Sequence, residues 1–224
     1  MTQKALTETL QSLPLFDKIN SEDIPTLTQC LGTAVKTYKK GEYLLHEGQD
    51  MSHLLVILEG HADMYKNSGA VSSLMRRAIE GDVLGAASIG PETSPCQMSA
   101  VAVTACTVLA IPYRRLMYHC PRNCTFHHRL VKNLVVTISQ GQKQLYEKIL
   151  VISQKSIRDK ILVYLHTQTA MEPGVPVTIP YSRTELAHYL CTDRSALSRE
   201  LNAMQKEGIL SVEDNTFTLL NPAE

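Results

Sequence analysis

Residues 182–210 read SRTELAHYLCTDRSALSRELNAMQKEGIL, and this stretch decides the fold of the C-terminal part of the chain. Ser182 is followed three residues later by Glu185, and such a capping box predicts the start of a short helix. A tight turn is expected at residues 191–192. Asp193 directly after it is a favoured N-cap residue, so a second helix is expected to begin there.

The second helix has an apolar and a polar side. Its apolar side chains recur at spacings of four and three residues, and Gly208 is expected to end the helix. They are Leu197, Leu201 and Met204. Two short helices joined by a tight turn, the second opening with an arginine-bearing face, are typical of a helix-turn-helix.

The polar side of this helix predicts a surface for double-stranded DNA. An arginine can donate two hydrogen bonds to guanine O6 and N7, worth roughly 1–3 kcal/mol of discrimination, and a serine can bond a base edge or a phosphate. The expected base-reading residues are Arg194, Ser195, Ser198 and Arg199, and those expected over the DNA backbone are Ser182, Arg183 and Asp193. The alternative is a solvated helix face with two ordinary arginines. Residues 152–224 hold 7 basic and 9 acidic side chains, a net charge of −2, so few phosphate contacts per subunit are expected.

Two segments with different residue patterns precede this motif. Between residues 34 and 112, short apolar stretches separated by glycine turns predict a small β-sandwich or barrel. Residues 125–152 contain no proline and one glycine, which predicts a long helix. We therefore expect an α+β chain with a β-roll in 1–124, a dimerisation helix in 125–152 and a winged helix-turn-helix in 153–224.

Apolar residues of the long helix recur near a 3.5-residue repeat, which predicts a seam between two copies of the chain. The expected seam residues are Val131, Leu134, Ile138, Gly141, Leu145 and Ile152. The alternative is a long helix that packs on its own barrel.

Composition narrows the class of protein. The 224 residues carry 22 basic and 22 acidic side chains, and no apolar run approaches the length of a membrane span. The first eight residues are too polar for a secretory signal, and the six cysteines lie far apart, so we expect a cytoplasmic protein with reduced thiols. The sequence shows no Ser-His-Asp spacing and no phosphate-binding glycine loop, which argues against an enzyme.

The chain resembles the Crp/Fnr family of bacterial transcription regulators over nearly its whole length. The matching stretches are Gly41-Glu42, Glu47-Gly48, Leu58-Glu59-Gly60, Gly81-Asp82-Val83-Leu84-Gly85, Glu185-Leu186-Ala187, Asp193-Arg194-Ser195 and Ser198-Arg199. The resemblance implies a homodimer that binds DNA and RNA polymerase. It places Arg194 and Arg199 at the two base-reading arginines, and Ser195 where many members carry a glutamate.

The resemblance fails in the β-roll, where cyclic-nucleotide-binding members carry a glutamate for the ribose and an arginine for the cyclic phosphate. Those positions hold Ala86 and Cys96 here. Without the arginine a cyclic phosphate would lose a charge-assisted pair, so no binding of cAMP or cGMP is expected. The roll is then expected either to be filled by its own side chains or to hold an unidentified effector and no cofactor. The residues expected to line such a pocket are Gly85, Ala86, Ser88, Cys96, Gln97 and Asn133.

A redox-, metal- or haem-responsive regulator is the alternative. Cys120, Cys124 and His127 have the Cys-x3-Cys-x2-His spacing that could hold a metal, and the two thiols could form a disulfide. The simpler reading is that both cysteines pack as small apolar residues. An iron-sulfur cluster is not expected, because Cys30, the first cysteine, has no close cysteine neighbour.

Overall fold

The computed structural model describes residues 2–69, 71–88, 95–117, 125–168 and 174–220. The chain forms two compact units, Met1–Ser72 with Arg77–Gln142, and Ser73–Arg76 with Lys143–Glu224. In the described residues no helix is both long and apolar enough to cross a membrane.

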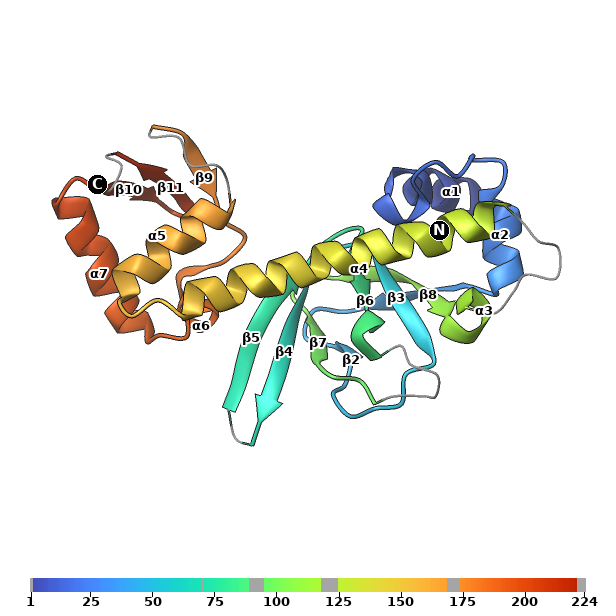
Figure 1. Cartoon of the computed structure of the whole chain (residues 1–224), viewed down its shortest axis with the longest axis horizontal. Helices are drawn as coiled ribbons and strands as arrows, with labels where there is room; N and C mark the ends of the chain where they lie inside the picture. Colours follow the sequence, from blue (N-terminus) through green and yellow to red (C-terminus); the bar gives the residue numbers. More distant parts are fainter. Residues whose placement is uncertain (1, 70, 89–94, 118–124, 169–173, 221–224) are drawn as a thin grey trace. The chain divides into compact units, whose positions relative to one another are not determined.

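The N-terminal unit has helical segments followed by an antiparallel β-roll (Figure 1). Its helical segments are α1 (Gln3–Ser12), η1 (Pro14–Phe16), α2 (Ile24–Leu31), η2 (Ala86–Ser88) and α3 (Tyr113–Met117). The strands are β1 (Ala34–Tyr38), β2 (Tyr43–Leu45), β3 (His53–Glu59), β4 (Ala62–Ser68), β5 (Val71–Ala78), β6 (Val83–Leu84), β7 (Ser99–Ala102) and β8 (Cys106–Pro112). They form two four-stranded sheets, in the orders β1-β8-β3-β6 and β2-β7-β4-β5. The predicted β-roll is confirmed.

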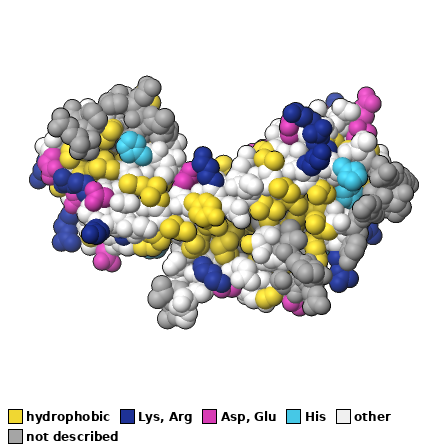
Figure 2. Space-filling view, in the orientation of Figure 1, with side chains coloured by type: hydrophobic (Ala, Val, Ile, Leu, Met, Phe, Trp, Pro, Cys, Tyr) yellow, Lys and Arg dark blue, Asp and Glu magenta, His cyan; other side chains and the backbone are white. Residues whose placement is uncertain are grey.

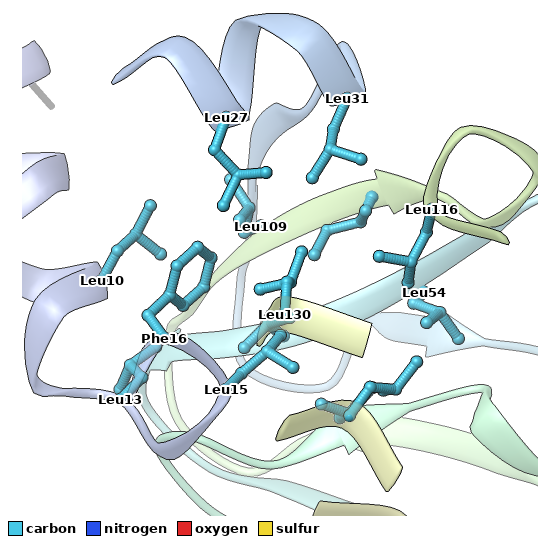
Figure 3. Close-up of a cluster of buried hydrophobic side chains, with 14 of the residues drawn as sticks. Leu10, Leu13, Leu15, Phe16, Leu27, Leu31, Leu54, Leu109, Leu116 and Leu130 are labelled. Carbon is cyan, nitrogen blue, oxygen red and sulfur yellow. The ribbon is translucent and has the colours of Figure 1, made fainter. Parts of the chain in front are cut away.

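Strand β3 contributes to two hydrophobic clusters, because alternate side chains of a strand point to opposite faces. Leu55 and Ile57 belong to a cluster shared with the second sheet, whereas Leu54 and Val56 face the helices. Figure 3 shows the helical side of this core, where Leu10, Phe16, Leu27 and Leu31 gather with Leu54, Leu109 and Leu130. The roll is therefore covered on one face by its own helices.

The long helix α4 (Thr125–Ile152) has the predicted bounds, and its first half packs on its own roll. Leu130 is buried in that core, and Leu134 is only 3% exposed there. Val131 and Ile138 pack against the same cluster. The seam predicted from the spacing therefore requires correction, because Leu134 is already buried within its own chain.

The C-terminal unit contains the end of α4, three further helices and a small sheet. These are α5 (Ile157–Gln168), β9 (Pro176–Thr178), α6 (Arg183–Tyr189), α7 (Arg194–Lys206), β10 (Leu210–Glu213) and β11 (Thr216–Leu219). The strands pair in the order β10-β11-β9, which confirms the predicted wing. Leu197, Leu201 and Met204 form the buried face of α7, as their spacing predicted.

Candidate nucleic-acid interface

Helix α6 begins with the capping box that the sequence predicts. The Ser182 Oγ accepts a hydrogen bond from the Glu185 backbone N–H at 3.4 Å, and a Glu185 carboxylate oxygen accepts one from the Ser182 N–H at 2.7 Å. These bonds satisfy backbone donors that a helix N-terminus leaves unpaired. Ser182 therefore fixes the start of α6 within the chain, whatever else its hydroxyl contacts.

The turn between α6 and α7 centres on Cys191, whose φ of 50° lies in the left-handed region. Few non-glycine residues adopt this conformation. The Thr192 N–H donates to the carbonyl of Ala187 at 3.0 Å, and the Lys160 ammonium donates to the carbonyl of Leu190 at 3.2 Å. A cation is favourable at the end of a helix because the helix dipole is negative there.

The first turns of α7 present an open polar face. Arg194, Ser195 and Arg199 are exposed, and Ser198 is partly exposed. In the part of the chain that the structure describes, neither arginine guanidinium makes an ion pair or a side-chain hydrogen bond. Asp193 is the N-cap residue, although its side chain forms no capping hydrogen bond. Both guanidinium groups therefore remain available to an external acceptor.

Glu200 of α7 and its C-cap residue Glu207 are both paired with one arginine of α5. The Arg158 guanidinium donates to Glu200 at 2.7 Å and to both carboxylate oxygens of Glu207 at 2.7 and 2.9 Å. These charge-assisted bonds hold the pKa of the Glu207 carboxyl below its ordinary value. Helix α7 itself carries three basic side chains and one acidic side chain, so the net charge of −2 over residues 152–224 does not describe the charge that α7 offers to DNA.

Arg183 lies against the wing. One of its guanidinium nitrogens donates to the carbonyl of Asp214 at 2.9 Å, and the guanidinium carbon lies 4.9 Å from the centre of the Phe217 ring. Burial lowers the pKa of this side chain. These contacts fix the wing to α6, and the contact of Arg183 with the DNA backbone stays a prediction.

The predicted effector-pocket residues are only partly brought together. Ser88 Oγ accepts a hydrogen bond from the Gln97 N–H at 3.3 Å. The Cys96 thiol is 4% exposed and donates to the carbonyl of Met98 at 3.0 Å. Ala86 packs against the helical side of the core.

Gly85 and Ser88 line a cavity of about 10 Å³ with Met51, His53, Leu54 and Tyr113, which is room for one water molecule. Asn133 lies elsewhere in the same unit. Its side-chain amide donates to the carbonyls of Leu15 and Asp17 at 3.0 and 2.8 Å and so ties α4 to η1. Asn133 is therefore a structural residue rather than a member of this pocket.

Of the alternative metal or redox site, only His127 lies within the described residues. Cys120 and Cys124 lie outside the described residues. His127 is buried, and its Nε2 lies 2.8 Å from the carbonyl oxygen of Leu116. Among the described residues, no group of three or more potential ligands could hold a metal ion.

Sequence reasoning missed three basic residues that organise the C-terminal unit: Lys148, Arg158 and Lys160. One signal was available for Lys148, because it shares a helix face with Leu134 and Gly141 at multiples of seven residues and follows the buried line of α4. Arg158 carried no such signal, because its partners lie more than 40 residues away in the chain.

Family models match both halves of the chain. A cyclic nucleotide-binding domain matches residues 35–122, and a Crp-like helix-turn-helix domain matches residues 160–224. The chain is 22% identical to the anaerobic regulatory protein of Bacillus subtilis over 93% of this chain and 88% of that protein. It is 24% identical to the fumarate and nitrate reduction regulatory protein of Vibrio cholerae, over 92% and 82%.

Solved structures show the same fold. The CooA mutant from Carboxydothermus hydrogenoformans superposes with a TM-score of 0.71 at 16% identity, over 94% of this chain and 96% of that one. FixK2 from Bradyrhizobium japonicum gives a TM-score of 0.63 at 17% identity, over 84% and 93%. The order of the two matched domains, the relatives and the open arginines of α7 together identify the chain as a DNA-binding transcription regulator of the Crp/Fnr family, not an enzyme.

Proposed function

We propose that the protein is a homodimer that reads a roughly palindromic operator through α7, and that it acts on RNA polymerase once bound. The observation that carries the proposal is the pair of guanidinium groups, Arg194 and Arg199, left unpaired by the described residues at the start of α7. In a two-fold dimer the two α7 helices would enter successive major grooves about 34 Å apart.

Each arginine is assigned to a guanine, because a guanidinium matches O6 and N7 with two hydrogen bonds. Ser195 and Ser198 lie on the same helix and would contact a base edge or a phosphate. A serine hydroxyl at position 195 is shorter than a glutamate side chain and can donate as well as accept, whereas a glutamate carboxylate only accepts, so the half-site should differ from that of relatives with a glutamate. Ser182 and Asp193, the N-cap residues of α6 and α7, remain proposed neighbours of the DNA backbone.

We place the dimer surface on the open side of α4. Val135 and Val136 are exposed there in the N-terminal unit, and Tyr146, Ile149 and Leu150 are exposed in the C-terminal unit. In the view of Figure 2, apolar side chains gather over the region that α4 crosses in Figure 1. Large exposed apolar side chains on one helix are typical of a surface that another chain covers. Of the seam predicted from the sequence, Leu145 and Ile152 lie one turn from Ile149 and stay compatible with this surface, whereas Gly141 lies on the helix face of Leu134 and Lys148.

The β-roll is proposed not to bind cyclic nucleotides. The Cys96 thiol at the phosphate-arginine position donates to the carbonyl of Met98 and is buried. Ala86 has no group for a ribose hydroxyl. Calorimetric titration with cAMP and cGMP should therefore show no binding in the micromolar range, and a micromolar affinity for either would contradict this proposal.

Selection of operators from random DNA tests the proposed function directly. The wild-type protein should enrich a palindrome with guanines in each half. Arg199→Ala should bind DNA without sequence preference, because the interaction that distinguishes guanine is lost. Lys206→Ala is the matched control, since it removes an exposed cation from the other end of α7 and should leave the preference intact. Full operator selectivity in Arg199→Ala would refute the role of this residue.

A further inference from the structure

Lys148 places a positive charge inside the C-terminal unit. The side chain is 2% exposed, and its Nζ lies 3.9 Å from the centre of the Tyr189 ring. Among the described residues no carboxylate lies within ion-pair distance of this ammonium group. The one hydrogen-bond contact that the described part of the chain gives this ammonium group is with the Cys191 Sγ, at 4.0 Å. A buried charge normally has a partner of opposite charge, so the thiol is the candidate counter-ion.

Cys191 is open to solvent on its other side. It is exposed and lies in the turn between α6 and α7, three residues before Arg194. The charged groups around this turn are Lys148 from α4, Lys160 from α5, whose Nζ binds the carbonyl of Leu190, and exposed Asp193 after the turn. Cysteines that react as thiolates have these surroundings, namely solvent access and nearby cations.

We propose that Cys191 is a modification site, at which a thiolate stabilised by Lys148 reacts with low-molecular-weight disulfides. The thiolate sulfur attacks one sulfur of the disulfide, the S–S bond breaks, and a mixed disulfide forms on Cys191. The leaving thiolate takes up the proton that Cys191 released, so no further oxidant is needed. Cys191 is the one cysteine in residues 143–224, and an intrachain disulfide within this unit is therefore impossible.

Modification would act on the turn that positions α7. A mixed disulfide removes the negative partner of Lys148 and adds a substituent beside the first base-reading arginine. DNA affinity should therefore fall at least tenfold. This regulatory consequence rests on the proposed function, whereas the reactivity of Cys191 does not.

The reactivity is tested on the full-length reduced protein with 4,4′-dithiodipyridine. Peptide mass spectrometry gives the rate at Cys191 separately from the other cysteines, and buried Cys96 should stay unmodified as a check of folding. At neutral pH Cys191 of the wild-type protein should react faster than the cysteine of an unstructured peptide, because a nearby cation favours the reactive thiolate. A reaction no faster than that of the peptide would overturn the proposal without any variant.

Variants then assign the effect to Lys148. Lys148→Met should lower the reaction rate of Cys191 at neutral pH about threefold, because the cation that favours the thiolate is lost. Lys148→Arg should keep the wild-type rate. Lys143→Met, which removes a largely exposed lysine from the same helix, is the control and should change nothing. An unchanged rate in Lys148→Met would refute the role of Lys148.

Gel shifts separate this inference from the proposed function. Protein treated with glutathione disulfide should lose operator affinity and regain it after reduction, whereas Cys191→Ser should be insensitive to the treatment. If the mixed disulfide forms at Cys191 without changing affinity, the regulatory consequence is wrong. If the untreated protein selects no operator, the proposed function is wrong while the reactivity of Cys191 is still measured independently.

Discussion

A buried ammonium group lowers the stability of the unit that contains it, and Lys148 shows this at the scale of one residue. Desolvation lowers its pKa from 10.5 to about 8, since burial disfavours the charged form. Contact with the Tyr189 ring compensates in part, because a cation is attracted to an aromatic face. The contact of this charged group with the Cys191 Sγ fits a role for the charge at that thiol.

Replacing this lysine should stabilise the C-terminal unit. Below about pH 8 the folded protein must keep a proton on Lys148 against the cost of burial, whereas the unfolded chain binds it freely up to about pH 10.5. Wild-type stability should therefore rise between these two values. Lys148→Met should add about 2–3 kcal/mol to the unfolding free energy at neutral pH, and the gain should vanish near pH 10.5. Chemical denaturation at several pH values measures this, and a gain independent of pH would contradict it.

At the scale of the element, Arg158 fixes α7 relative to α5 through Glu200 and Glu207. The Arg158→Met variant should lower the thermal stability of the unit and weaken binding to all DNA sequences by a similar factor. The preference for particular bases should remain, because Arg194 and Arg199 are still present. The affinities of wild type and variant for the operator and for a mutated operator distinguish a uniform loss of binding from a loss of base preference. A loss of affinity for the operator alone would show that Arg158 itself reads bases.

The ion pair of Arg158 and Glu207 also makes the stability of the folded protein depend on pH. Because the folded state lowers the pKa of Glu207, the pair stabilises the protein above the ordinary glutamate value and loses its effect as pH falls through the lowered value. Glu207→Gln should therefore destabilise the protein at neutral pH and not in strong acid. Melting temperatures of the two proteins should converge as the pH is lowered.

The open side of α4 should be the element that joins two chains. Ile149→Glu places a charge among exposed apolar side chains and should convert the dimer to a monomer in sedimentation analysis. Gln140→Glu is the control, because residue 140 is an exposed polar position half a turn around α4 from Ile149. A dimer that survives Ile149→Glu would place the interface elsewhere.

At the scale of the whole molecule, the sequence predicted the bounds of helices and strands better than it predicted which parts of the chain pack against them. The bounds of α4 followed from the absence of proline and the single Gly141, and the capping box at Ser182 formed as predicted. The face of α4 that meets a second copy of the chain could not be predicted in the same way. A spacing of three and four residues indicates a buried stripe, but it does not show whether the same chain or a partner buries that stripe. Leu134 is buried by its own roll. Arg183 was assigned to DNA because its wing partners, Asp214 and Phe217, are distant in sequence.

The same distant contacts allow a prediction for the salt dependence of DNA binding. Of the 7 basic side chains in residues 152–224, three are used inside the unit, namely Arg158, Lys160 and Arg183. Two more, Arg194 and Arg199, are assigned to bases, so Lys155 and Lys206 remain for phosphates.

Each neutralised phosphate contributes about −0.9 to the slope of log affinity against log salt, and the dimer should therefore give a slope no steeper than about −4 for contacts of this unit. The monomeric Ile149→Glu variant should give about half that slope. Fluorescence anisotropy with one operator over a range of salt concentrations measures both values. A slope near −10 would mean that cations outside residues 152–224 hold the DNA, because this unit has too few free ones to release so many counterions.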